Sequence, residues 1–345
     1  METTLSAATT QLRSPADPLL EVRGLSKRFA VEHDMLGRPT KWLSAVEDVS
    51  LSVRKGETLA LVGESGSGKS TLARLILRLV RASSGEVRFE DKDVLSLSGS
   101  QMTAFRARAQ IIFQDPFESL DPRMKGEAIV AEGMSHLGLS KAAKRDRVRE
   151  LLEIVQLPND AADRFPHEFS GGQRQRLSIA RALAVDPVFI VADEPVSALD
   201  VSMQSQILNL MQDLQDRLGL TYLFISHDMS VVRHVANRVA VMYLGRLVEL
   251  APASELFRNP RHPYTQTLLS AVPPLLTDRE GDRIRVTGEP IAQSGAPACA
   301  FANRCFRPLD ICRQQVPLLE AQAQHPDHWV ACFNPTDFAS PGSQA

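Results

Sequence analysis

Cysteine, long apolar segments and an excess of basic charge are all missing from most of this 345-residue chain. No cysteine occurs before Cys299, and the N-terminus has no apolar run, which excludes a typical secretory signal. The longest apolar stretches, such as Val188–Ala192, are far shorter than the roughly 20 residues that a transmembrane helix needs. A formal net charge of −2 argues against a dedicated nucleic-acid binder. We therefore expect a cytosolic protein that reaches a membrane only through a partner.

The arrangement of apolar and polar segments predicts two structured parts. Residues 1–18 are rich in Ser, Thr, Ala and Pro, which predicts disorder. Over residues 19–255, short apolar runs alternate with helical patterns, as in an α/β fold with a largely parallel sheet. Prolines then cluster, which predicts a boundary before a small C-terminal extension over residues 256–345 that holds all four cysteines.

A glycine-rich segment follows the predicted strand Val53–Val62 and precedes a helical pattern. Gly63–Ser70, which we call the phosphate loop, reads G-x-x-x-x-G-K-S, a pattern whose backbone N–H groups and helix N-terminus bind phosphate. Lys69 adds a positive charge for the β- and γ-phosphates, and the Ser70 hydroxyl is a ligand for Mg²⁺. The residues predicted to bind nucleotide here are Gly63, Glu64, Ser65, Gly66, Ser67, Gly68, Lys69, Ser70 and Thr71.

Two carboxylates end the apolar run that starts at Val188. Paired acids at a strand end are often only a solvated turn, but the phosphate loop in the same chain favours a catalytic role. Asp193 is predicted to hold Mg²⁺, directly or through water. Glu194 is predicted to be the general base that polarises the attacking water.

A second anion-binding segment lies far from the phosphate loop in the sequence. Phe169–Gln173, the signature segment, places Ser170, Gly171 and Gly172 at the start of a helical pattern. The chain therefore offers two phosphate-binding surfaces on separate segments.

Together these motifs resemble those of the ATP-binding-cassette (ABC) ATPases over roughly residues 19–250. Phe169 stands where the family usually has Leu, outside the Ser-Gly-Gly core. The other matching positions are Asp193 and Glu194 in the second Walker motif, Ser197–Asp200 in the D-loop, His227 as the switch histidine and Gln114 as the Q-loop glutamine. The resemblance implies a P-loop nucleotide-binding domain with a RecA-like core, an antiparallel β subdomain and a helical signature subdomain over about residues 115–180.

The same resemblance implies a head-to-tail dimer. ATP on one phosphate loop would be capped by Ser170, Gly171, Gly172, Gln173 and Asp200 of the other subunit. His227 would stabilise charge near the γ-phosphate, and Gln114 would contact Mg²⁺ and assist catalysis. Phe29 would stack on adenine, although a strand-core role is the alternative.

The C-terminal segments narrow the subfamily. The stretch after Gln114 and the segment Arg261–Pro273 resemble the peptide and nickel importer ATPases. The spacing Cys-x5-Cys-x6-Cys-x19-Cys alone fits a [4Fe–4S] cluster, a zinc site, or thiols that are unliganded or linked in disulfides. The resemblance favours a [4Fe–4S] cluster, with zinc as the alternative, on Cys299, Cys305, Cys312 and Cys332.

We therefore expect the ATP-hydrolysing subunit of a bacterial importer of di- or oligopeptides, peripheral to the cytoplasmic face of the inner membrane. Its expected partners are a second ATPase subunit, identical or paralogous, two transmembrane permeases and an extracytoplasmic peptide-binding protein, with no nucleic acid. A nickel or small-solute importer of the same subfamily is the alternative. A nucleic-acid or ribosome ATPase is disfavoured by the single cassette and the absence of a coiled-coil insert or basic excess. A regulatory nucleotide binder that does not hydrolyse ATP would lack Glu194 or His227, and both are present.

Overall fold

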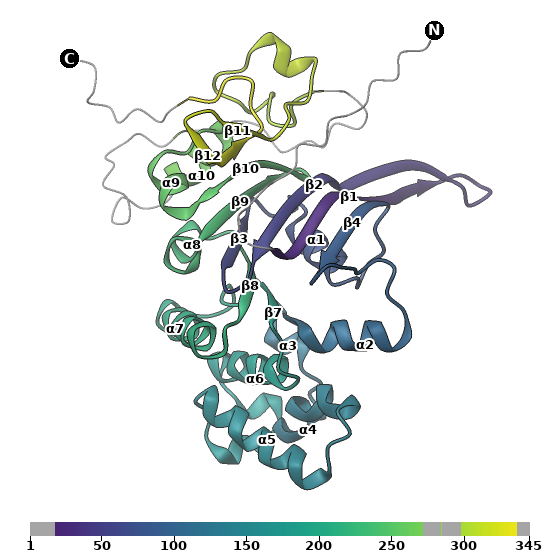
Figure 1. Cartoon of the computed structure of the whole chain (residues 1–345), viewed down its shortest axis with the longest axis vertical. Coiled ribbons are helices and arrows are strands. Elements are labelled where there is room, and N and C mark those ends of the chain that lie inside the picture. Colours follow the sequence, from purple (N-terminus) through teal and green to yellow (C-terminus); the bar gives the residue numbers. More distant parts are fainter. Residues whose placement is uncertain (1–17, 272–283, 285–297, 337–345) are drawn as a thin grey trace.

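Strands between residues 58 and 330 form one mixed sheet in the computed structural model, which describes residues 18–271, 284 and 298–336 (Figure 1). The predicted disorder of residues 1–18 lies, apart from Pro18, outside the described residues. Within the described part the sheet has eight strands in the order β11-β12-β10-β9-β3-β8-β7-β6. Their bounds are β3 Thr58–Val62, β6 Ala109–Ile112, β7 Phe189–Asp193, β8 Thr221–Ser226, β9 Arg238–Tyr243, β10 Arg246–Pro252, β11 Glu320–Gln322 and β12 His325–Val330.

The central strands of this sheet are parallel, as the continuous apolar runs predict. Strands β6, β7, β8, β3 and β9 pair in parallel, and every residue of β3, β7 and β8 is buried. Runs that are apolar at every position suit strands covered on both faces. Because parallel strands end at the same edge, the segments after β3, β7 and β8 meet there, where ligands bind in open α/β sheets.

A second sheet is antiparallel and lies beside the first (Figure 1). Its order is β2-β1-β4-β5, formed by Pro39–Arg54, Pro18–His33, Ser84–Phe89 and Lys92–Asp93. Strands β1 and β2 form a long hairpin, in which Phe29 pairs with Leu43. The hairpin carries these two side chains to the edge of the nucleotide cavity described below.

Helices flank the mixed sheet and also form a separate group below it (Figure 1). The flanking helices are α1 Lys69–Ile76, α2 Gly99–Arg108, α7 Val201–Leu218 and α8 Met229–Val235. The lower group consists of α3 Pro116–Ser119, α4 Gly126–Ala131, α5 Lys141–Ile154 and α6 Gly171–Leu183. Ten of the thirteen residues of α6 are buried, so this helix forms much of the core between the group and the sheet.

The C-terminal part adds to the mixed sheet. Strand β12 pairs with β10, and the helices α9 Ala253–Arg258 and α10 Pro263–Ser270 follow β10 directly. Glu249 of β10 is fully buried and accepts hydrogen bonds from the backbone of Arg261 and His262, at 2.8 and 3.0 Å. It also lies 2.6 Å from Nε2 of the buried His328 of β12. The division of the chain near residue 255 remains a prediction, because strands from both sides of it share one sheet.

Candidate active site

The phosphate loop runs from the end of β3 into α1, and its glycines are required by the fold. Gly63 and Gly68 have φ angles of +153° and +104°. A Cβ atom at Gly63 would lie 2.2 Å from the carbonyl oxygen of Met242, and one at Gly68 would lie 2.3 Å from that of Ala45. Both positions therefore exclude a side chain on steric grounds, and Gly68 also on backbone conformation.

The Lys69 side chain folds back over this loop. Lys69 is buried, and its Nζ donates to the carbonyl oxygens of Gly63 at 2.7 Å and Glu64 at 2.9 Å. Burial lowers the pKa of the ammonium group, and the nearby Glu194 and Asp193 oppose that shift. The two hydrogen bonds thus hold the Lys69 ammonium group at the loop, where an anionic phosphate would compensate for the desolvation of that group.

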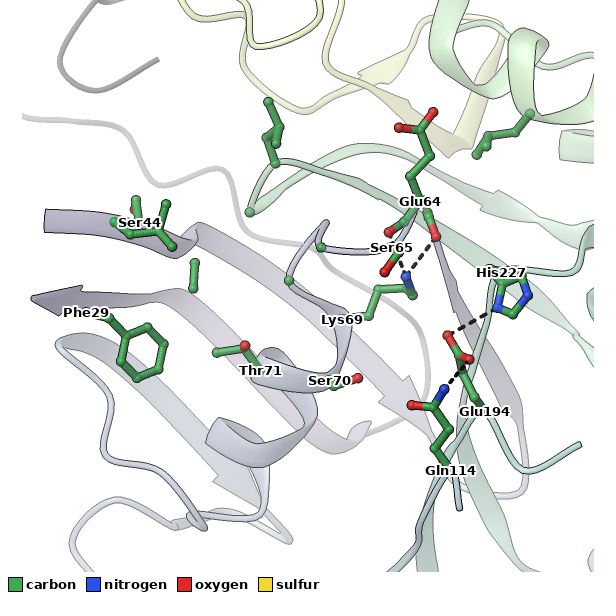
Figure 2. A pocket seen from close by; sticks show the side chains of 18 residues that line it. Phe29, Ser44, Glu64, Ser65, Lys69, Ser70, Thr71, Gln114, Glu194 and His227 are labelled. Atoms are coloured by element: carbon green, nitrogen blue, oxygen red, sulfur yellow. Dashed lines mark hydrogen bonds and ion pairs between the residues drawn. The ribbon is translucent and has the colours of Figure 1, made fainter. Parts of the chain in front are cut away.

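A cavity of about 870 Å³ lies in front of the loop and has an aromatic end and a carboxylate end. Every predicted phosphate-loop residue except the buried Ser67 lines it. Figure 2 shows Phe29 at one end and Glu194 with His227 at the other, with Lys69 between them. Phe29 is 38% exposed, and the Lys27 ammonium lies 4.8 Å from the centre of its ring. The cavity suits a ligand with an aromatic group at one end and phosphates at the other.

The carboxylate end joins three segments that are distant in the sequence. Glu194 follows β7, accepts a hydrogen bond from Gln114 Nε2 at 2.9 Å and lies 3.2 Å from His227 Nδ1 (Figure 2). Glu194 has a φ of +48°, in the left-handed region that residues other than glycine seldom adopt. Strain of this kind is often found at functional sites, because the surrounding structure must hold it.

The predicted magnesium ligands have suitable chemistry. The Ser70 hydroxyl donates to Asp193 Oδ1 at 3.0 Å, and burial is the main cause that raises the pKa of Asp193. Gln114 lies beside Glu194 and contributes an amide oxygen. Hydroxyl, carboxylate and amide oxygens are the hard donors that Mg²⁺ prefers, so this set fits the ion.

The signature segment and Asp200 do not line the cavity. Ser170 and Gln173 cap α6 reciprocally: the Ser170 N–H donates to Gln173 Oε1 at 3.0 Å, and the Gln173 N–H to Ser170 Oγ at 3.3 Å. Asp200 caps α7 in a similar way, through a 2.9 Å bond from the Met203 N–H. Glycine at position 172 leaves room for the Met203 side chain. One chain therefore places these predicted nucleotide contacts together, but away from its own phosphate loop.

Several contacts of the loop were missed by the sequence reasoning. Ser44, Ala45 and Gly245 line the cavity beside the predicted residues. Tyr264 Oη accepts a hydrogen bond from the Glu64 N–H at 2.8 Å, and Arg304 pairs with the Glu64 carboxylate at 2.9 Å. Tyr264 lies in the importer-like segment 261–273 and Arg304 lies between the cysteines, but neither position carries a spacing signal that points to the loop.

The prediction of a [4Fe–4S] cluster, with zinc as its alternative, is wrong. The described residues include all four cysteines, and they contain no group of three or more Cys, His, Asp or Glu side chains that could hold a metal ion. The cysteines are free thiols, so they form no disulfide. Burial raises the pKa of Cys299 and Cys305, and that of Cys332 to about 11. Cys299 and Cys305 pack instead against the apolar cluster that contains Tyr264 and Phe301.

Comparison with known proteins agrees with the fold and the cavity. Residues 46–197 match the family model described as ABC transporter, and residues 248–312 match that for the C-terminal region of oligopeptide/dipeptide transporters. A putative peptide import ATP-binding protein of Brucella ovis is 47% identical over 92% of this chain and 98% of its own length. The oligopeptide transport ATP-binding protein OppF of Bacillus subtilis is 52% identical over 79% of this chain and 88% of its own. The dipeptide transport ATP-binding protein DppF of Haemophilus influenzae is 46% identical over 92% of this chain and 97% of its own length.

Solved structures give the same result. The cbiO1 protein of Clostridium perfringens, part of an ABC transporter complex, superposes with a TM-score of 0.60 at 28% identity, covering 70% of this chain and 91% of its own. The dimeric cassette MJ0796 bound to ADP and Pi gives a TM-score of 0.59 at 28% identity, covering 68% of this chain and 98% of its own.

The parallel sheet, the phosphate loop and the carboxylates beyond it define a nucleotide-hydrolysing P-loop enzyme. With the matches above, the chain belongs to the ABC transporter family of ATP-binding proteins. The predicted α/β fold and the ATPase activity are thereby confirmed. Among the described helices, none combines the length and hydrophobicity needed to cross a bilayer.

Proposed function

We propose that this chain is the ATP-hydrolysing subunit of an importer for dipeptides or oligopeptides. The observation that carries the peptide assignment is the match of residues 248–312 to the oligopeptide/dipeptide transporter C-terminal region, in a chain whose phosphate loop faces an 870 Å³ cavity. The relatives in Brucella, Bacillus and Haemophilus carry peptide import or transport in their names, which supports the same substrate class.

In this proposal, the cavity binds ATP with adenine at its Phe29 end and the phosphates at the loop. Lys69 lies between Phe29 and Glu194 in Figure 2, where the terminal phosphates would lie in this proposal. The Lys69 ammonium and the N–H groups at the start of α1 would neutralise the phosphate charge.

Glu194 would accept a proton from the attacking water as it approaches the γ-phosphate. The 2.9 Å bond from Gln114 and the 3.2 Å contact with His227 hold both carboxylate oxygens, which orients the base. The His227 side chain is 58% exposed, so it is accessible to a phosphate in the cavity that it also lines. A donor at that point would stabilise charge as it develops in the transition state.

The residues that would hold Mg²⁺ are Ser70, Asp193 and Gln114. The ion would neutralise charge on the β- and γ-phosphate oxygens. The Ser70–Asp193 hydrogen bond of 3.0 Å keeps the two side chains adjacent, and Lys69 balances part of the carboxylate charge.

A second ATPase subunit would complete each site. Ser170, Gly171, Gly172, Gln173 and Asp200 cluster at the starts of α6 and α7, away from the phosphate loop of their own chain. In a head-to-tail pair they would cap the nucleotide of the other subunit. The dimeric state of MJ0796, a structural neighbour, supports this arrangement.

Two permeases and an extracytoplasmic peptide-binding protein would supply the membrane path and select the substrate. The ATPase would then sit at the cytoplasmic face of the inner membrane. Closure of the ATPase pair around ATP, and its opening after hydrolysis, would move the permeases.

Uptake measurements in the organism that encodes the chain test this function. Deletion of the gene should abolish uptake of labelled di- or oligopeptides, the wild-type gene should restore it, and a gene encoding Lys69→Met should not. Loss of nickel uptake with normal peptide uptake would instead identify the nickel importer of the same subfamily. Normal uptake of peptides and nickel in the deletion strain would contradict both assignments.

A further inference from the structure

Glu64, the second residue of the phosphate loop, is held through three of its groups. Its carbonyl oxygen accepts a hydrogen bond from Lys69 Nζ at 2.9 Å, and its N–H donates to Tyr264 Oη at 2.8 Å. Its carboxylate receives two bonds from the Arg304 guanidinium, at 2.9 and 3.1 Å. Two of the three anchors therefore come from the C-terminal extension, 200 and 240 residues along the chain.

Arg304 is itself fixed in place. Its side chain is only 12% exposed, and Nη1 also donates to Tyr243 Oη at 3.3 Å. Tyr243, Tyr264 and Phe301 pack around it, with ring centroids 4.6 to 5.4 Å apart. The guanidinium carbon lies 5.8 Å from the Tyr243 ring and 6.0 Å from the Phe301 ring. A planar guanidinium that is packed this way and forms two bonds to one carboxylate fixes both its position and its orientation.

The charge balance at the loop depends on this pair. Glu64 lines the same cavity as Lys69, so its carboxylate would repel a triphosphate placed there. Arg304 neutralises that carboxylate from the side of the extension. The hydrogen bond from Arg304 to the Glu64 carboxylate is also the main cause that raises the pKa of the Arg304 guanidinium, as expected for an arginine beside an acid.

We propose that Arg304 and Tyr264 are positioning residues for ATP binding: the C-terminal extension of a subunit sets the geometry and charge of that subunit's own phosphate loop through Glu64. The extension thereby becomes part of the nucleotide site in cis. This inference rests on the proposed binding of ATP at the loop, and it assigns to residues outside the cavity a role in affinity.

A matched control exists in the same extension. Arg307 is also partly buried, and it bonds to Thr336 Oγ1 and, at 3.3 Å, to the carbonyl oxygen of Arg261. It does not line the cavity. Arg307→Gln removes a comparable side chain from the extension without changing the charge at Glu64.

The experiment measures the Kd for Mg-ATP by fluorescence titration of the purified full chain, and kcat by phosphate release. We expect Arg304→Gln to raise Kd about threefold to tenfold, the net contribution of one ordinary hydrogen bond, because Arg304 acts on ATP only through Glu64; kcat at saturating ATP should change little. Arg304→Lys keeps the charge and should give a smaller increase. The double variant Glu64→Gln with Arg304→Gln should return Kd close to wild type, because the uncompensated carboxylate is gone. Arg307→Gln should leave Kd unchanged.

Three results would overturn the inference. They are an unchanged Kd in Arg304→Gln, an equal increase in Arg307→Gln, and a double variant as weak as Arg304→Gln alone. Thermal melting checks that each variant is folded, and if Arg304→Gln does not fold, the Arg304→Lys and double variants decide the question. If the wild-type chain binds no ATP, the proposed function fails instead, so the two failures are distinguishable.

Discussion

Replacement of Glu194 by glutamine separates ATP binding from hydrolysis in this site. The side chain keeps its size, and its amide oxygen can face Gln114 Nε2, which now lies 2.9 Å from Oε2. The amide nitrogen can then face His227 Nδ1, at the present 3.2 Å. Both neighbours are retained and the phosphate loop is untouched, so we expect the fold and the Kd for ATP to stay close to wild type.

Turnover should respond very differently, because the amide cannot accept a proton from water. General-base catalysis contributes about 10²- to 10⁴-fold to a rate. This range corresponds to about 3 to 5 kcal/mol of activation free energy. The loss should fall on kcat, since the missing interaction is made in the transition state.

Phosphate release under saturating Mg-ATP measures kcat, and nucleotide titration measures Kd on the same preparation. Glu255→Gln serves as a control, because this acid lies in α9 and pairs with Arg258 outside the cavity. A Glu194→Gln protein that hydrolyses ATP at the wild-type rate would refute the general-base assignment. A large rise in Kd would show that the residue acts in binding instead.

Three further changes test other parts of the structure. Gly68→Ala should weaken ATP binding, measured by titration, about tenfold or more. Its Cβ would lie 2.3 Å from the Ala45 carbonyl oxygen, and the residue would have to adopt a φ of +104°. The control Gly56→Ala has a φ of +77° but open space around its Cβ, and it should not change the Kd for ATP. Phe29→Ala should raise the Kd for ATP about tenfold if the ring stacks on adenine, and Phe29→Trp should largely restore it; equal Kd values for all three would leave the ring a packing role. Burial lowers the pKa of His262 to about 4, below its value of about 6.5 in the unfolded chain. Between these two pH values the unfolded state binds more protons than the folded state, so the stability of the protein should decrease as the pH falls from about 6.5 to 4. Thermal melting should show a weaker pH dependence over this window in His262→Asn, and an unaltered dependence would contradict the assignment.

The core of the fold could be predicted because its signals are local. Strands β3, β7 and β8 are short apolar runs buried on both faces, and the phosphate loop follows one of them directly. The position of Glu194 was equally accessible, since it directly follows such a run; its catalytic role remains a prediction. The strands of the extension were not, because β11 is only three residues long, too short for a polarity pattern to stand out, and β12 begins with His-Pro-Asp, which contains two residue types that are depleted in strands.

The long-range contacts and the arrangement of the cysteine sulfur atoms could not be predicted from the sequence, for a common reason. The pairing of Glu64 with Arg304 spans 240 residues, and no periodicity reports such a contact. Cysteine spacing states how far apart thiols lie along the chain, but it does not state whether their sulfur atoms converge or are deprotonated. Here they form no metal-binding group among the described residues, and burial raises the pKa of three of them.

The pairing of β12 with β10 has a consequence for how this enzyme is made. Strand β10 is synthesised some 80 residues before its partner, since Glu249 pairs with Val330. Until the ribosome has released that last strand, the edge of β10 is open, and the Glu249 carboxylate lacks His328. Unpaired strand edges promote association between chains, so we expect a product that stops before β12 to aggregate more readily than the full chain. A chain that stops before residue 304 would also lack the Arg304 partner of Glu64 at its phosphate loop.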